Sequence, residues 1–473
     1  MTRVVRPYVG GRFVAGDSTE ELRSPWDGRV VARVEPAGPA LAETALEAAW
    51  AARPAAQALS TARRRAALEG IAARIAERAE SFARSISEEC GKPIAVARKE
   101  VERAVATFSF AAAEAVRFGG ETLPIDLDSA SEGYQAITRR VPRGVVVAIS
   151  PFNFPLNLGA HKVAPALAVG APVIWKPPPQ APGAAHLLAE IVDSLSLPAG
   201  LFQVLPCANE VAERVATDER IGVLSFTGSE RVGWALKQKA TRAKVVLELG
   251  GNAAAIVCAD ADLERAAHRC AFGGMVYAGQ VCISVQRIFV EEAVYDAFRE
   301  KLLAEVAKLA VGDPSHETTV IGPMIDVRHA ERVESWIEEA RARGAIVHGG
   351  KREGAVLHPA VLEEVPPDAR VACEEVFGPV VLLSRFSTFD EALEKVNDSR
   401  FGLQAGLFTD SLSRVRRAWE RLEVGGLIVG DYPTYRQDNM PYGGVKASGL
   451  GREGLLYAME DYTEPRLLVL GKP

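Results

Sequence analysis

The sequence has few aromatic residues and no uninterrupted apolar run long enough to cross a membrane. Aromatic side chains make up 7% of its 473 residues. No stretch approaches the roughly 18 apolar residues that a membrane-spanning helix requires. No apolar run follows the charges of residues 1–10, so this segment lacks the pattern of a signal peptide. We therefore expect neither a membrane span nor an export signal.

Clusters of basic residues are also missing. The formal net charge is −6, and no arm or stripe of lysine and arginine offsets it. An acidic chain without such a patch is not attracted non-specifically to nucleic acid or to anionic lipid. We expect no nucleic acid and no membrane among its partners.

Cysteine pairs at the spacing of metal ligands are absent. The six cysteines stand apart, at positions 90, 207, 258, 270, 282 and 373. In a chain of this length they indicate reduced thiols and a cytoplasmic setting rather than a disulfide framework. The histidines show no ligand spacing either, so no metal is expected. All the cysteines except Cys282 are expected to be small buried hydrophobic residues.

The chain has the composition of a globular protein, with 48% hydrophobic and 25% charged residues. Its length is too great for one simple core, so two or three domains are expected. Residues 8–14 have the pattern of a hairpin. Residues 41–118 have helical spacing, with breaks expected near Pro54, Gly70 and residues 91–93.

Two series of apolar runs then alternate with helical patterns. Strands of the first series are expected at 145–150, 173–175, 201–205 and 222–226, and its helices at 182–194 and 210–216. Strands of the second are expected at 254–257, 287–290, 380–383 and 426–429, and its helices at 261–278, 292–310 and 326–343. Continuous apolar runs predict parallel, doubly wound sheets with a crevice at the carboxyl ends of the strands. The final run, 466–470, should either complete a local sheet or pair with another subunit.

Two short glycine-containing motifs hold the most reactive side chains, Glu248 in residues 247–251 and Cys282 in residues 279–284. A thiol can form a covalent adduct, and a carboxylate can activate water against the resulting thioester. Alone, each has an ordinary interpretation, as a solvated glutamate or as a core cysteine after a helix. Flanking leucines predict an apolar setting that raises the pKa of Glu248. Cys282 needs either a lowered pKa or a base in order to react at neutral pH.

With further motifs in the same order, the chain resembles the aldehyde dehydrogenase superfamily over essentially its whole length. The seven matching segments are 151–156, 175–177, 226–229, 247–251, 279–282, 374–379 and 441–449. A closer likeness, to the lactaldehyde and phosphonoacetaldehyde dehydrogenase-like branch, depends on residues 157–166 and 435–442.

The resemblance implies an α/β fold with two doubly wound αβ lobes, one for the cofactor and one catalytic, and a small β element for oligomerisation. The implied NAD(P)-binding domain comprises residues 1–118 and 139–246. The catalytic domain comprises 247–440, and the oligomerisation element comprises 119–138 and 455–473.

The resemblance also implies roles for individual residues. Cys282 would attack the aldehyde, and Glu248 would activate water to hydrolyse the thioester. Asn153 would donate its amide to the developing oxyanion, together with the backbone N–H of Cys282. Such donors typically stabilise a transition state by about 3–4 kcal/mol. NAD or NADP would be bound by Ser150, Pro151, Phe152, Lys176, Gly228, Ser229, Leu249, Glu375 and Phe377.

The spacing alone gives weaker support for a dinucleotide site. Gly228 and Ser229 open a helix, and a helix N-terminus suits a pyrophosphate. No GxGxxG fingerprint follows the first strand, however. The expected cofactor site therefore depends on the resemblance.

Three residues are candidates for contact with the substrate. His161 and Arg436 stand where they could meet a polar or anionic substrate tail. Glu453 matches a second carboxylate that some relatives place near the route of the active-site water. A purely structural hydrogen bond is an equally good interpretation for each.

Two positions depart from the family pattern. Pro179 stands where many NAD-preferring relatives carry a glutamate that binds the adenosine ribose and repels a 2′-phosphate, so the preference between NAD and NADP stays open. Val281 precedes Cys282, where members that handle phosphonate or phosphate often carry arginine. Its presence favours a small uncharged hydroxyaldehyde or, at most, a short semialdehyde.

The sequence therefore predicts an NAD(P)-dependent, non-acylating aldehyde dehydrogenase that acts on a small aldehyde, as a homodimer or homotetramer in the cytoplasm. Two alternatives stay open. One is a coenzyme A-acylating enzyme, against which Glu248 argues. The other is a catalytically silent homologue with a binding or structural role, against which the intact Cys282, Glu248 and Asn153 argue.

Overall fold

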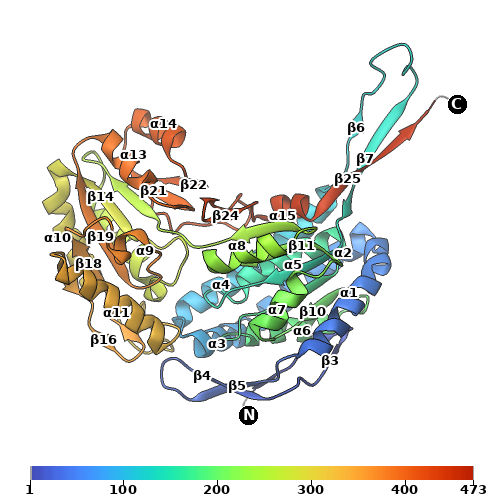
Figure 1. The fold of residues 1–473 in the computed structure, drawn as a ribbon, viewed down its shortest axis with the longest axis horizontal. Coiled ribbons are helices and arrows are strands. Elements are labelled where there is room, and N and C mark those ends of the chain that lie inside the picture. The colour runs from blue at the N-terminus through green and yellow to red at the C-terminus, as the bar shows by residue number, and fades with distance from the viewer. Residues whose placement is uncertain (1–2, 472–473) are drawn as a thin grey trace.

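The chain forms two α/β lobes that lie side by side, and a narrow arm projects from one of them (Figure 1). The computed structural model describes residues 3–471. The outer ends of the predicted segments 1–118 and 455–473 lie outside the described residues. The expected fold class, two doubly wound lobes with a small β element, is confirmed.

The first lobe is built on an eight-stranded sheet in the order β24-β12-β11-β8-β9-β10-β2-β3. The five strands from β12 to β10 are parallel, and the strands beyond them on each side pair antiparallel. The strands of this sheet are β2 (Tyr8–Val9), β3 (Arg12–Phe13), β8 (Val145–Ile149), β9 (Val173–Lys176), β10 (Phe202–Val204), β11 (Ile221–Thr227), β12 (Lys244–Glu248) and β24 (Gly449–Leu450).

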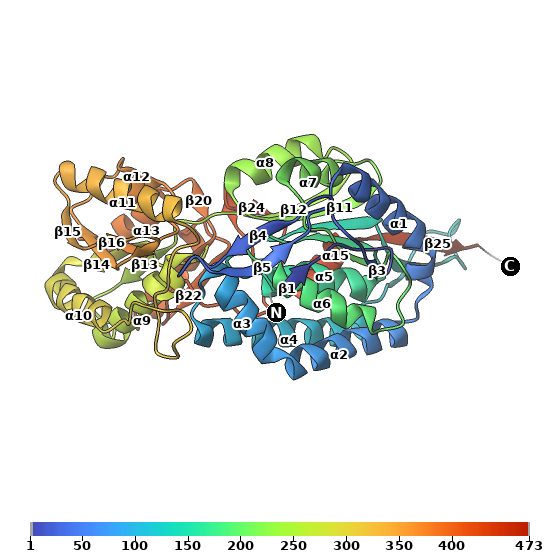
Figure 2. The same cartoon turned by 90° about the horizontal axis from the view of Figure 1, so that it is seen from below.

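Helices cover both faces of this sheet (Figure 2). Along β8, Val145 and Val147 pack toward α1, α7 and α8, whereas Val146 packs toward α2 to α6. Because both faces are buried, the strand is apolar at every position, as the sequence predicted. The helices of this lobe are α1 (Pro39–Ala58), α2 (Thr61–Glu77), α3 (Ala79–Cys90), α4 (Ile94–Arg117), α5 (Asn157–Val169), α6 (Gly183–Asp193), α7 (Asn209–Ala216), α8 (Glu230–Lys239) and α15 (Leu455–Asp461).

Two of the predicted helix breaks, at Pro54 and Gly70, are wrong. Helix α1 continues through Pro54, and the Trp50 carbonyl, which loses its usual donor there, accepts a hydrogen bond from Arg53 Nε at 3.1 Å. Helix α2 continues through Gly70 because burial of its apolar face outweighs the low helix propensity of one glycine. The break expected at 91–93 is confirmed.

The second lobe is built on a seven-stranded sheet in the order β15-β18-β19-β14-β13-β21-β22, parallel except at β15. Its strands are β13 (Ala254–Val257), β14 (Arg287–Glu291), β15 (Ile346–Gly349), β18 (Ala360–Glu363), β19 (Val380–Phe386), β21 (Gln404–Phe408) and β22 (Gly426–Val429). Its helices are α9 (Leu263–Met275), α10 (Tyr295–Ala307), α11 (Val327–Ala342), α12 (Arg370–Cys373), α13 (Phe389–Asn397) and α14 (Leu412–Arg421). Helices α9 to α11 cover one face, and α13 and α14 cover the other.

The helix predicted at 261–278 is too long. Helix α9 ends at Met275, and a 3-10 turn, η1 (Val276–Gly279), follows. In this turn Tyr277 and Ala278 have φ values of +55° and +52°, which non-glycine residues rarely adopt. The turn ends three residues before Cys282. A second short 3-10 turn, η2 (Glu292–Val294), precedes α10.

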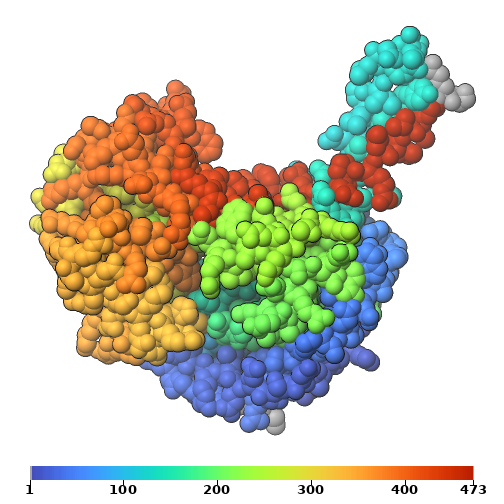
Figure 3. Space-filling view, viewed as in Figure 1, coloured from blue at the N-terminus to red at the C-terminus, as the bar shows by residue number. Residues whose placement is uncertain are grey.

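The arm is a three-stranded antiparallel sheet of β6 (Thr122–Leu123), β7 (Gln135–Pro142) and β25 (Thr463–Leu470). The C-terminal strand thus completes a local sheet. The domain boundary predicted between residues 138 and 139 falls inside β7. No other strand in residues 3–471 pairs with the outer edge of β25. Residues 467–470 are 45–57% exposed there, and Figure 3 shows the arm standing clear of both lobes.

Smaller sheets complete the fold. They are β1 (Arg3–Val5) with β5 (Val30–Val34) and β4 (Glu20–Arg23), β16 (Arg352–Glu353) with β17 (Val356–Leu357), and β20 (Phe401–Gly402) with β23 (Val445–Lys446). Four cysteines are buried as expected, but Cys373 is exposed, because α12 ends at the surface. No helix within residues 3–471 combines the length and apolarity of a membrane span.

Candidate active site

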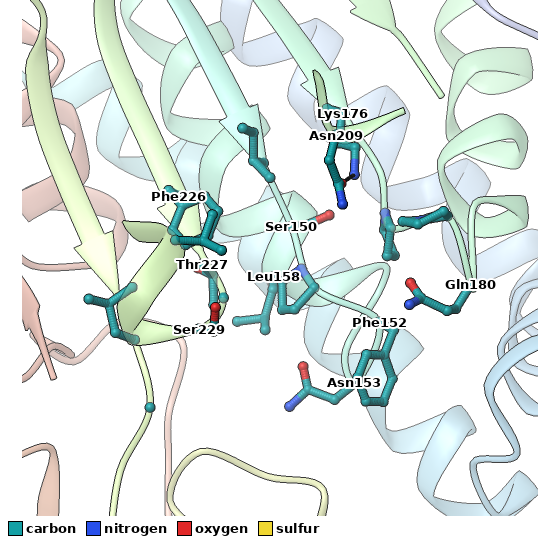
Figure 4. A pocket seen from close by; sticks show the side chains of 18 of the residues that line it. Ser150, Phe152, Asn153, Leu158, Lys176, Gln180, Asn209, Phe226, Thr227 and Ser229 are labelled. Carbon is teal, nitrogen blue, oxygen red and sulfur yellow. Dashed lines mark hydrogen bonds between the residues drawn. The ribbon is translucent and has the colours of Figure 1, made fainter. Parts of the chain in front are cut away.

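A cavity of about 680 Å³ opens where the parallel strands of the first lobe end, and its far wall belongs to the second lobe. This volume lies in the range of small-molecule sites. All nine residues expected at the cofactor line the cavity, and so do Asn153 and Cys282. Figure 4 shows Lys176 and Asn209 at one end of the labelled side chains and Asn153 at the other.

One end of the cavity suits the adenosine half of a dinucleotide. Lys176 ends β9, and its Nζ donates to Asn209 Oδ1 at 3.5 Å. Burial lowers the pKa of Lys176. Gly228 and Ser229 lead into α8, whose first turn receives no cap from any side chain in the described part of the chain. Its free N–H groups therefore suit a pyrophosphate.

The other end suits the nicotinamide half. Glu375 Oε1 accepts a hydrogen bond from the Gly251 N–H at 3.0 Å, and burial raises the pKa of Glu375 to about 7. A Cβ atom at Gly250 would lie 2.5 Å from Glu375 Oε2, so this approach requires glycine. Phe377 has a φ of +47°, and its ring meets that of Phe152 edge to face, with centroids 6.0 Å apart. The residues present fit a dinucleotide.

Cys282 lies in the cavity wall next to a tyrosine that the sequence analysis did not single out. Its Sγ is 3.0 Å from the hydroxyl oxygen of Tyr442. Burial raises the pKa of Cys282 to about 11, although Tyr442 and Arg436 act in the opposite direction. The thiol is therefore protonated at neutral pH. A lowered pKa, one of the two conditions stated for Cys282, is not found, which leaves assistance by a base.

Asn153 follows β8 in the loop before α5. One of its amide N–H groups donates to the Gln280 carbonyl at 2.9 Å, which leaves the second N–H free. Glu100 Oε1 accepts the backbone N–H groups of Leu156 and Asn157 at 2.9 and 3.0 Å, and so fixes the start of α5. Asn153 is thus held next to Cys282 with one donor available.

Glu248 ends β12 and lies behind this wall rather than lining the cavity. Neither carboxyl oxygen has a hydrogen-bond partner in residues 3–471. A Cβ atom at Gly443 would lie 2.7 Å from Oε1, so the carboxyl group packs against a residue that must be small. Burial, and then the charge of Glu453, raise the pKa of Glu248 well above its usual range. The apolar setting expected for Glu248 is present.

Glu453 is the second buried carboxylate of the site. It accepts hydrogen bonds from Lys162 Nζ at 2.6 Å and from Arg436 Nη2 at 2.9 Å. Burial opposes ionisation, but Lys162 and Arg436 outweigh it and lower the pKa of Glu453. The surroundings therefore favour the ionised form of Glu453 and the protonated form of Glu248, a separation typical of catalytic pairs.

His161 belongs to a neighbouring polar cluster. Its Nε2 lies 2.8 Å from Asp438 Oδ1, an atom that also accepts from Arg103 at 2.8 Å and Asn157 at 3.1 Å. Burial opposes ionisation of Asp438, but His161 and Arg103 lower its pKa. Burial lowers the pKa of His161, so its ring is neutral and Nε2 carries the proton toward Asp438. Its Nδ1 is then an acceptor, with no partner among the residues described.

Several residues of the site were missed by the sequence analysis. His329 and Arg332 lie one turn apart on α11 and line the cofactor cavity. Lys162 and Tyr442 stood inside motifs already noted, next to His161 and Pro441. For His329 and Arg332 the sequence offers no signal, because a charged face of a helix usually contacts solvent.

Comparison with known proteins identifies the family. The profile of the aldehyde dehydrogenase family matches residues 13–468. A 3-sulfolactaldehyde dehydrogenase of Priestia aryabhattai is 49% identical over 395 residues, which cover 83% of each chain. A lactaldehyde dehydrogenase of Methanocaldococcus jannaschii is 37% identical and covers 98% of this chain and 100% of its own. These relatives confirm the likeness to the lactaldehyde-like branch.

Solved structures agree with this result. Aldehyde dehydrogenase 21 from Physcomitrella patens, in complex with the reaction product succinate, has a TM-score of 0.97 and 42% identity over 100% of this chain and 99% of its own. The glyceraldehyde-3-phosphate dehydrogenase GapN from Methanocaldococcus jannaschii, complexed with NADP, has a TM-score of 0.92 and 37% identity over 96% and 100% of the two chains.

Proposed function

This chain belongs to the aldehyde dehydrogenase family, whose members depend on NAD or NADP, and we propose that it oxidises a small hydroxy- or semialdehyde to the carboxylic acid without coenzyme A. One observation carries the proposal. Cys282 and Asn153 line the same cavity as all the expected cofactor residues, and the charge of the buried, unpartnered carboxyl group of Glu248 acts on the Cys282 thiol.

The first half of the reaction acylates Cys282. Its Sγ, once deprotonated, bonds to the aldehyde carbon, and the carbonyl electron pair moves to oxygen. The free N–H of Asn153 and the backbone N–H of Cys282 would stabilise that oxygen. When bound, the nicotinamide ring supplies the hydride acceptor. Lys176, Glu375 and Phe377 would hold the cofactor in place, and Cys282 is left as a thioester.

The second half hydrolyses the thioester. Glu248 takes a proton from water, the water oxygen bonds to the acyl carbon, and the Cys282 sulfur leaves with the electron pair. Glu248 suits this role because both its oxygens are free and its raised pKa makes it a stronger base than an exposed glutamate.

The charges around the site support a substrate with one acidic or strongly polar group. Lys162, Arg436 and Arg103 are cations, and two carboxylates, Glu453 and Asp438, face them. Arg436 Nε is a buried donor without a partner in the described chain, and His161 Nδ1 is a buried acceptor. The carboxylate of a short semialdehyde would accept from Arg436, and only the hydroxyl of a 2-hydroxyaldehyde would donate to His161 Nδ1. Neither residue lines the cavity itself, so these contacts lie deeper than its wall. An acidic end would offset the preference for an uncharged substrate drawn from Val281.

An aldehyde panel tests this assignment. We expect kcat/KM for lactaldehyde, 3-sulfolactaldehyde and succinic semialdehyde to exceed that for unsubstituted aldehydes of equal length by about tenfold or more, because an unpaired buried polar group costs about 1–3 kcal/mol. NADH or NADPH absorbance measures the rates. Equal rates for apolar aldehydes would contradict the proposed substrate but not the proposed class of reaction. A requirement for coenzyme A in product release would instead identify an acylating enzyme.

Replacement of Pro179 by glutamate should shift cofactor preference toward NAD. Pro179 lines the cavity beside Lys176, and a carboxylate there would repel a 2′-phosphate. We expect kcat/KM with NADP to fall about tenfold or more relative to that with NAD. Pro179→Gln is the matched uncharged control and should preserve the ratio. Equal losses with both cofactors in Pro179→Glu would show that residue 179 does not contact the 2′-phosphate.

The arm and the cysteines support the remaining assignments, a homodimer or homotetramer in the cytoplasm. Residues 467–470 present an exposed apolar strand edge, which suits pairing with another subunit. Six free thiols suit a reducing compartment. Sedimentation velocity measures the mass in solution, and a monomer at micromolar concentration would contradict the assembly.

A further inference from the structure

We infer that Tyr442 is a further catalytic residue of the proposed reaction, whose phenolic hydroxyl donates a hydrogen bond to the Cys282 thiolate and holds Sγ in position for attack. The phenol oxygen lies 3.0 Å from Sγ. Tyr442 is 3% exposed, so water does not compete freely for this contact. The inference rests on the proposed covalent role of Cys282.

The direction of this hydrogen bond follows from the order in which the two groups ionise. Burial raises the pKa of Cys282 to about 11 and raises that of Tyr442 well above its usual value of 10. A thiol is ordinarily the stronger acid of the two, and burial opposes ionisation of both, so the thiol loses its proton first and the phenol donates. The sulfur has no second hydrogen-bond partner in the described part of the chain, so Tyr442 is its one donor there, and the charge of Arg436 adds to the stabilisation of the thiolate.

A second interaction fixes the tyrosine. The guanidinium carbon of Arg436 lies 3.7 Å from the centre of the Tyr442 ring. Arg436 is held by Glu453 at 2.9 Å, and Glu453 by Lys162 at 2.6 Å. A cation over the ring face draws electron density from the phenol and so strengthens its hydroxyl as a donor. Arg436 and Glu453 act through Tyr442 and are positioning residues.

Proton and charge remain balanced through the acylation step. A solvent water molecule is the base that takes the proton of Sγ, and Tyr442 keeps its phenolic proton throughout. As the carbon–sulfur bond forms, the negative charge moves from sulfur to the aldehyde oxygen. The hydrogen bond from Tyr442 then weakens, and the one from Asn153 strengthens. Hydrolysis releases Sγ as a thiolate, which again accepts the hydrogen bond from Tyr442.

The test uses alkylation of Cys282 by iodoacetamide in the cofactor-free protein, followed by peptide mass spectrometry over a range of pH. The thiolate sulfur bonds to the methylene carbon, and iodide leaves. Tyr442→Phe keeps the ring under Arg436 and removes only the hydroxyl. We expect the pH midpoint of alkylation to rise by about one to two units, the size of one hydrogen bond to a charged group. At fixed neutral pH, alkylation should slow about tenfold or more.

Tyr295→Phe is the matched control. It removes a buried phenol hydroxyl that donates to Glu363 at 2.7 Å in the second lobe, far from the cavity lining. Its midpoint should equal that of the unmodified protein. Cys373 is exposed, so its alkylation in the same digest serves as an internal reference.

Two results would overturn the inference. One is an unchanged or lowered midpoint in Tyr442→Phe. The other is an equal rise in Tyr295→Phe, which would assign the effect to loosened packing. The proposed function is tested by a different experiment, in which the protein is incubated with aldehyde. If no adduct formed at Cys282 there, the proposed function would fail, whereas alkylation needs neither aldehyde nor cofactor and would still test Tyr442.

Discussion

Replacement of Cys282 by alanine is expected to lower aldehyde-dependent formation of NADH or NADPH by at least about 10⁴-fold. Cys282 is the only cysteine that lines the cavity in the described part of the chain. No neighbouring side chain offers a comparable nucleophile, because Tyr442 is held protonated by burial. Without Sγ no thioester forms, so the reaction has no covalent path to the acid for Glu248 to complete.

The same variant should still bind its cofactor. Lys176, Gly228 and Glu375 lie on other elements and do not hydrogen-bond to Cys282. We expect the dissociation constant of NADPH or NADH, measured by fluorescence titration, to change by no more than about threefold. Cys373→Ala, at the exposed end of α12, is the control and should turn over normally. Turnover that survives in Cys282→Ala would reject the covalent mechanism.

Most parallel strands of the two lobes were predictable because a strand covered on both faces is apolar throughout, although β12, β18 and β21 were missed. Val145 and Val147 face one helical layer and Val146 the other, so the run is apolar at each position. Helix breaks were harder to predict, since they depend on packing that a local pattern does not contain. Pro54 is tolerated because a side chain of the same helix supplies a donor to the freed carbonyl.

The conformation of the turn before Cys282 is another feature that the sequence did not predict. Tyr277 and Ala278 adopt left-handed backbone conformations, which cost of order 1 kcal/mol or more each for residues other than glycine. Tertiary contacts hold them there, including a hydrogen bond from the Tyr277 N–H to the Val320 carbonyl at 3.0 Å. Gly273 and Gly274 weaken the helix near its end, but glycines of low helix propensity do not by themselves fix its last residue at Met275.

The reactive residues were predictable by their motifs, but their electrostatics were not. Lys162 and Glu453 are 291 positions apart in the chain, and Cys282 and Tyr442 are 160 apart. Which of the two buried carboxyl groups holds the proton depends on which one meets the cations. The sequence identifies Glu248 and Glu453 as candidates, and only the fold assigns the charge to Glu453.

That assignment leads to the second large effect, expected for Glu248→Gln. The first turnover should remain fast, with about one NADH or NADPH formed per site, and the steady-state rate should then fall about 10²–10⁴-fold. Glutamine matches the shape of the neutral glutamic acid that burial already favours, so the fold should be preserved. It cannot take a proton from water, so the thioester should accumulate. Acid quenching followed by mass spectrometry would detect the acyl group on Cys282.

The pKa of Glu248 also predicts the direction in which the rate of hydrolysis changes with pH. The pKa of Glu248 is raised, so its basic form is present above that pKa and is lost as the pH falls through it. Hydrolysis in the unmodified protein should slow toward acid pH, and Glu248→Gln should lose this dependence.

Glu89→Gln is the matched control, because burial raises the pKa of Glu89 to about 7 and its partners, Ser85 and Gly183, lie away from the cavity. It should keep both the burst and the steady state. If burst and steady state instead fell together in Glu248→Gln, Glu248 would act before the thioester forms, and the base for its hydrolysis would have to be another group.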